Sequence, residues 1–266
     1  MRTTFRKSAA LGSAVLALSL SPLWAQKPKS QKEVQAITAV QVAATPDDRI
    51  KAVENVLTNF ADTEFKVPLL QIAVQAAEQK NDYAQIVFYS DRLLKADPKN
   101  TFALVTLASE TARHTRENDL DKDEQLAKVD KWAKEGIEDA KNMGKVNPNE
   151  TDADLDKDRK DLQAQAYVAM GMADLLRKNY DGAANNYKQS LTLEATPNPA
   201  TLVRLAQVYI ASGKLDDANF TLDKVVNTPD VPAQIKQVAE TLKGDIAKRK
   251  PAGAPAAAPP AAAKQP

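Results

Sequence analysis

An internal repeat over residues 164–226 restricts the folds open to this chain more than any other feature. Shifted by 35 residues, the distance from Ala183 to Ala218, the segment lies over itself with its apolar and small positions in register. The matched pairs are Tyr167 with Leu202, Met170 with Leu205, Gly171 with Ala206, Tyr180 with Leu215, Ala183 with Ala218, Tyr187 with Leu222, and Leu191 with Val226. Each copy predicts two helices around a short polar turn, at 177–179 and at 212–214. Because one helix pair cannot bury its apolar face alone, a period of this length predicts stacked helical hairpins.

The composition supports an all-α fold of one ordinary-sized body. Helix-forming residues dominate, glycine occurs only 8 times, and aromatic residues make up 5% of the chain. An apolar content of 43% is enough for a continuous core. The formal net charge is +1, and three positive charges (Arg2, Arg6 and Lys7) lie at the start of the chain, so the remainder carries −2. This near balance gives no electrostatic footprint for nucleic acid.

The first 25 residues resemble a secretory signal peptide. The positive charges near the start precede the apolar stretch 9–20, which is shorter than the roughly 20 residues that span a bilayer. Residues 21–25 end in a small residue, Ala25, and predict a cleavage region, with an uncleaved anchor as the alternative. No other segment predicts a membrane span. Export without any cysteine favours the periplasm or envelope of a Gram-negative-type bacterium.

Helical periodicity divides the chain between this leader and its end into a series of units. Thr45–Pro46 is a typical helix start, with a capping hydroxyl followed by a proline in the first turn. The charged stretch 142–160 lengthens one unit, and we interpret the excess as longer helices plus a solvent loop. The predicted units are hairpins at 30–62 and 67–100, an extended unit at 101–163, regular repeats at 164–197 and 198–230, a capping helix at 232–249, and a disordered Ala/Pro-rich tail at 250–266.

The regular units resemble tetratricopeptide repeats. That family places small residues where its two helices approach closely, an aromatic residue between neighbouring pairs, and a closing proline. In the first regular unit the matching residues are Gly171, Ala183, Tyr187 and Ser190; in the second they are Ala206, Tyr209 and Ala218; in an earlier unit they are Asp82–Tyr83 and Asp97–Pro98. The tryptophan of the family pattern is absent from every unit. A generic α-solenoid therefore remains the alternative fold.

The resemblance implies a superhelix in which the first helix of each hairpin lines a concave groove that holds an extended peptide or a partner helix. Projected onto this chain, the groove positions are Phe102, Val105, Ser109, Arg113, Gln165, Val168, Met172, Val203, Arg204, Gln207 and Ile210. This set is apolar with Gln and Arg and has almost no acids, so we expect an apolar segment there, with Arg113 and Arg204 free to meet a carboxylate. Some of these residues are alternatively expected in the core. One subfamily clamps a C-terminal carboxylate, but only Arg204 here falls on a clamp position.

Catalytic and metal-binding patterns are missing from the sequence. His114 is the only histidine and no cysteine accompanies it, so neither a zinc site nor a histidine-activated nucleophile has sufficient material. Alternating aspartates at 152–158 and 119–123 resemble a calcium loop, yet both lack the glycine and glutamate that such a loop requires. We therefore expect no metal and no cofactor.

These observations predict a non-enzymatic protein- or peptide-binding scaffold or adaptor of the bacterial cell envelope, which acts through its groove. The alternative is a self-associating structural protein whose Ala/Pro tail acts as a cell-wall spacer. An enzyme is the third hypothesis, and it would need a catalytic set that the sequence does not display. The identity of a protein or peptide partner is not encoded in these patterns.

Overall fold

The computed structural model describes residues 27–145 and 149–249, and in these ranges it contains eleven helices and no strand. The predicted leader (1–25) and tail (250–266) lie outside the described residues. The helices form five hairpins and one final helix. They are α1 (Gln31–Val42), α2 (Pro46–Asn59), α3 (Lys66–Gln79), α4 (Tyr83–Ala96), α5 (Thr101–His114), α6 (Lys122–Asn142), α7 (Asp152–Leu176), α8 (Tyr180–Leu193), α9 (Pro199–Ala211), α10 (Leu215–Asn227) and α11 (Ala233–Arg249). The predicted all-α fold of stacked hairpins is confirmed.

Local chemistry explains where the helices begin. Short polar side chains occupy the residue before most helices and accept a hydrogen bond from a free backbone N–H of the first turn. These capping residues are Ser30, Thr45, Asp82, Asn100, Thr151, Asn179 and Asn198. The helices α2 and α9 also carry proline in their first turn, where its missing N–H costs nothing.

Three hairpins share one turn geometry. Asn81, Lys178 and Gly213 each have positive φ, at 53°, 62° and 76°, just beyond the end of the first helix of their hairpin. In each case the next residue donates its N–H to a carbonyl five residues earlier, at 2.8–3.1 Å. This closes the helix by a Schellman motif, for which glycine is the least strained residue. The predicted helix end at Gly213 is confirmed, and the shared turn shows that the α3–α4 hairpin repeats the geometry of the two regular units.

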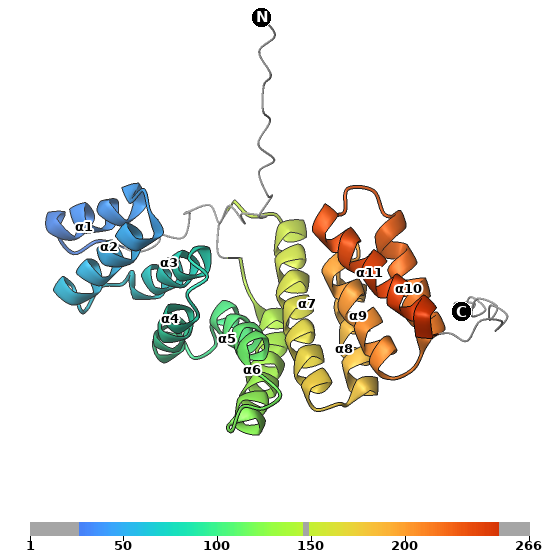
Figure 1. Ribbon diagram of the computed structural model, residues 1–266. Coiled ribbons are helices and arrows are strands. Elements are labelled where there is room, and N and C mark those ends of the chain that lie inside the picture. The colour runs from blue at the N-terminus through green and yellow to red at the C-terminus, as the bar shows by residue number, and fades with distance from the viewer. Residues whose placement is uncertain (1–26, 146–148, 250–266) are drawn as a thin grey trace, which may run out of the picture.

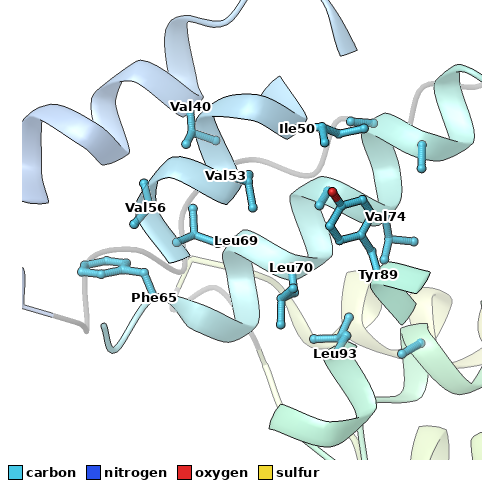
Figure 2. Packing of buried hydrophobic residues seen from close by; sticks show 14 of the residues in the cluster. Val40, Ile50, Val53, Val56, Phe65, Leu69, Leu70, Val74, Tyr89 and Leu93 are labelled. Carbon is cyan, nitrogen blue, oxygen red and sulfur yellow. The ribbon is translucent and has the colours of Figure 1, made fainter. Parts of the chain in front are cut away.

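Successive hairpins pack side by side along an arc from α1 to α11 (Figure 1). Each helix packs on the next, and α5 also packs on α7 and α9 on α11. The core follows this order in three clusters of buried apolar residues, one in α1–α5, one around α5–α7 and one from α8 to α11. Figure 2 shows the first cluster, where Val53 and Val56 of α2 meet Leu69 of α3, while Tyr89 and Leu93 of α4 close its other side. The core is therefore shared between neighbouring hairpins, as expected for stacked repeats.

The charged stretch 142–160 was interpreted as longer helices plus a solvent loop, and the structure shows that much of it is helical. The helix α6 runs to Asn142 and α7 starts at Asp152, so residues 152–160 are the first turns of a 25-residue helix. Thr151 and Asp154 form a capping box, and the ion pairs Lys157–Asp161 (2.6 Å) and Lys160–Asp156 (2.7 Å) connect successive turns. The expected boundary at 163/164 therefore falls inside α7, because acids near a helix N-terminus stabilise the helix.

Candidate functional site

A cavity of about 320 Å³ lies between successive hairpins, on the side formed by first helices. It is lined from the end of α3, from Ile86 of α4, from α5, from α7, and from α9 with the connection that precedes it. We call it the inter-hairpin pocket. Its lining residues are Glu78, Asn81, Ile86, Thr106, Ser109, Glu110, Arg113, Gln165, Val168, Ala169, Met172, Glu194, Asn198, Ala200, Thr201 and Arg204.

Six of the eleven predicted groove residues line this pocket, namely Ser109, Arg113, Gln165, Val168, Met172 and Arg204. The other five lie elsewhere. Val105 and Val203 are buried in the core, which is the alternative that the sequence left open. Phe102 and Ile210 pack against the first and last core clusters. Gln207 is exposed but does not line the pocket.

Three glutamates that the sequence did not predict also line the pocket, so its lining is more acidic than the projected groove positions. Glu78 lies in the last turn of α3, Glu110 in α5, and Glu194 directly after α8. Glu110 is four residues after Thr106 and three before Arg113, on one helical face. That spacing was the available signal for Glu110, whereas Glu78 and Glu194 arrive from helix ends that a projection of first-helix faces does not cover.

Glu110 is the most deeply buried acid of the pocket, with 6% of its surface exposed. Its Oε1 pairs with the Arg113 guanidinium at 2.9 Å. Its Oε2 lies 3.6 Å from His114 Nδ1 and accepts no hydrogen bond from any residue that the structure describes. The Nδ1 atom is instead 2.9 Å from the Glu110 carbonyl oxygen, and the His114 ring stacks on Tyr83 at 4.0 Å between centroids. One buried carboxylate oxygen of a residue that lines the pocket thus has no hydrogen-bond donor among the described residues.

The other two glutamates have raised pKa values. The pKa of Glu78 is raised to about 7, chiefly because surrounding atoms desolvate its carboxyl group and secondly because Glu110 repels its charge. Arg113 and the Thr106 hydroxyl act in the opposite direction. Desolvation also raises the pKa of Glu194, against the effect of the Asn198 N–H that donates to this carboxylate at 2.7 Å. Since Glu78 keeps an exposed surface at the rim, water screens part of the free-energy cost of its ionisation.

The two arginines of the pocket differ in their pairing. Arg113 pairs with Glu110, so its charge is partly compensated within the protein, which the sequence did not indicate. Arg204 forms no hydrogen bond or ion pair with the described part of the chain. Its guanidinium is therefore the pocket's one uncompensated cation within residues 27–145 and 149–249.

The chain is similar to known tetratricopeptide repeats in part of its sequence and in its fold. A family model described as tetratricopeptide repeat matches residues 174–239, which comprise most of α8 to α10 and the start of α11. A thermophilic tetratricopeptide repeat protein from Thermus thermophilus is 18% identical, with a TM-score of 0.52 over 79% of this chain and 98% of that one. Residues 174–239 are therefore similar to the tetratricopeptide repeat family, and the chain shares the fold of a tetratricopeptide repeat protein. The assembly chaperone of RpL4 (Acl4, residues 1–338) is similar only at a TM-score of 0.43, with 10% identity over 81% of this chain and 95% of its own. No curated protein sequence matches significantly.

The inter-hairpin pocket is the candidate binding site, because charged, polar and apolar side chains line it together. The described residues contain no group of three or more His, Asp or Glu side chains arranged to hold a metal ion. None of the helices between residues 27 and 249, outside the gap at 146–148, is long and apolar enough to cross a bilayer. A second, mainly apolar depression of about 610 Å³ lies beside α9 and α10. It includes the half-exposed Phe220, and Lys224 Nζ lies over that ring, 4.7 Å from its centroid. The pocket can form charge-assisted hydrogen bonds of both signs.

Proposed function

We propose that this protein is a non-enzymatic binding module of the bacterial cell envelope that holds a protein or peptide partner in the inter-hairpin pocket. The family supports the coarse function, because tetratricopeptide repeats are protein-interaction scaffolds. The observation that carries the proposal is the pocket itself, which joins side chains from the α3, α5, α7 and α9 regions and leaves charged atoms without partners. Such atoms are costly to desolvate alone, and a ligand that pairs with them recovers that cost.

Photo-cross-linking in cells tests the location of the binding surface. A photo-reactive amino acid replaces Gln165, an exposed pocket residue of α7, and in a matched strain it replaces Glu135, an exposed residue of α6 outside the pocket. We expect a discrete cross-linked partner from position 165 that is missing from position 135. Equal cross-linking from both positions, or none from position 165, would contradict the proposal.

Export is tested separately, because it rests on the leader sequence alone. We propose that residues 1–25 direct the chain to the periplasm. Osmotic-shock fractions and sequencing of the mature N-terminus check this. A start after Ala25 in the periplasmic fraction is the expected result, and recovery of the full chain in the cytosolic fraction would refute export while leaving the binding function open.

A further inference from the structure

The inter-hairpin pocket contains an acceptor without a donor, and this limits the chemistry of its ligand. Glu110 is more than nine-tenths buried, lines the pocket, and has one oxygen (Oε2) that accepts no hydrogen bond from residues 27–145 or 149–249. Leaving a buried charged acceptor without a donor costs more free energy than leaving a neutral acceptor without one. A ligand that donates a hydrogen bond to Oε2, and above all a cationic donor, removes this cost.

The net charge of the pocket lining also favours a positively charged ligand. Three carboxylates (Glu78, Glu110 and Glu194) face two guanidiniums (Arg113 and Arg204), so the fully ionised pocket carries one net negative charge. Arg113 already uses Glu110 Oε1 and leaves Oε2 available. A carboxylate has two oxygens and can accept from two cations at once, so the pair with Arg113 does not block a second donor.

The remaining wall of the pocket is complementary to a side chain with an apolar stem and a charged end. Val168, Ala169 and Met172 of α7 supply an apolar strip along the same cavity whose α5 side carries the carboxylate. Lysine and arginine combine an apolar stem with a cationic end, and they bury the stem along apolar surface while the charge meets its partner. Methionine adapts its shape to such a stem.

We propose that the pocket recognises a basic side chain, lysine or arginine, of an extended peptide, with the cation beside the Glu110 and Glu78 carboxylates and the stem along Val168 and Met172. This inference rests on the proposed function and specifies its ligand. The recognised charge is opposite to that of a ligand carboxylate, which is the group that Arg113 and Arg204 were expected to meet. Arg204 then lies free for a polar or acidic neighbour in the same peptide.

Ionisation of Glu78 makes this recognition depend on pH. The groups facing Glu78 are Thr106, Glu110 and Arg113 of α5; Gln165 of α7, and Glu194 and Arg204 from the α9 side, line the same pocket. Protonation of Glu78 removes the pocket's net negative charge. Because His114 lies beside Glu110, His114→Phe, which keeps a ring to stack on Tyr83, separates its contribution from that of Glu78.

Selection from a library of randomised decapeptides, blocked at both ends to remove terminal charges, tests the inference with the purified protein. We expect bound peptides to be enriched in Lys and Arg, and replacement of that residue by Gln to weaken binding by about ten- to a hundredfold. Glu110→Gln should weaken binding of the same peptides by a similar factor, and Glu78→Gln should remove the difference in affinity between pH 6 and pH 8. Glu138→Gln, an exposed glutamate of α6 paired with Lys141, is the matched control and should change binding less than about twofold.

Each outcome decides the inference. Selected peptides without a basic preference, or unchanged affinity in both Glu110→Gln and Glu78→Gln, overturn the basic-side-chain ligand, and cross-linking from position 165 still reports on the proposed function independently. Selection of no peptide at all also overturns it. If Glu110→Gln unfolds, as far-ultraviolet circular dichroism would show, Glu78→Gln keeps the test decisive because Glu78 is an exposed residue outside the buried core.

Discussion

Gly171 in α7 lies against the ring of Tyr187 in α8, and we predict that Gly171→Ala destabilises the protein. An added Cβ would come within 2.7 Å of Cε1, 2.8 Å of Cδ1 and 2.9 Å of Cζ of that ring. Carbon atoms attract each other only near 3.5–4.0 Å, so all three contacts are strongly repulsive. The ring is fully buried and cannot move into solvent. Either α7 and α8 must separate or the ring must leave its rotamer, and both changes disturb the core cluster from α8 to α11.

The size of the effect follows from two opposing contributions. Alanine in place of glycine inside a helix stabilises by about 1 kcal/mol, since the unfolded chain loses conformational freedom. Overpacking a well-filled core costs about 1–3 kcal/mol, and three contacts under 3.0 Å place this site at the upper end. We therefore expect a net loss of about 2 kcal/mol in the free energy of unfolding.

Gly244→Ala is the matched control, because Gly244 is an exposed helical glycine of α11 with no atom within 4 Å of an added Cβ. It should stabilise by about 1 kcal/mol. Urea unfolding followed by circular dichroism at constant m-value measures both variants. In Tyr187→Leu, which removes the ring atoms, adding Gly171→Ala should cost less than it does in the wild type. Equal stability of Gly171→Ala and Gly244→Ala would refute the steric reasoning.

Three further predictions use the same unfolding assay. Tyr187→Phe should not reduce stability, because the buried hydroxyl has no hydrogen-bond partner among the described residues; a loss above about 1 kcal/mol would contradict this. Glu33→Ala should cost about 1–3 kcal/mol, because this buried carboxylate accepts the Thr63 hydroxyl at 2.6 Å; Glu33→Gln should cost less. The Glu78 pKa is raised from 4.5 to about 7 in the folded state, so the folded chain binds the proton more tightly and stability falls as pH rises between these values. Glu78→Gln should flatten that fall, and an unchanged pH profile would contradict the raised pKa.

The stacked hairpins could be predicted from the sequence because each one carries local signals that agree. Asp82 and Asn179 cap second helices, and the 35-residue register aligns the apolar positions that become buried, such as Tyr187 and Leu222. Positive φ at Asn81 and Lys178 was less visible, since neither residue is glycine. The turn geometry is imposed there by the Schellman hydrogen bonds and not by the residue type alone.

The start of α7 is helical although its sequence has no helical period of apolar residues. A stretch rich in aspartate between 152 and 160 has no apolar period, so the pattern alone does not distinguish a helix from a loop there. In the structure its charge is distributed favourably, with Asp152 and Asp154 at the positive end of the helix and lysines one turn from their acids. Charge order therefore substitutes for an apolar stripe in this part of the helix.

The net charge of the pocket could not be predicted from the sequence for a related reason. A helical projection counts Arg113 as a free cation because it considers one side chain at a time, yet Glu110 stands three residues earlier and neutralises it. The same pair leaves Glu110 Oε2 without a hydrogen bond from the described residues, so a residue expected to attract acids instead holds a carboxylate that lines the pocket. Glu78 adds a second acidic group to the pocket from α3, which is separated from α5 in the chain by α4. The sign of charge in a repeat groove is thus set by pairs within a helix and by acids at neighbouring helix ends, and both become visible only when the hairpins are stacked.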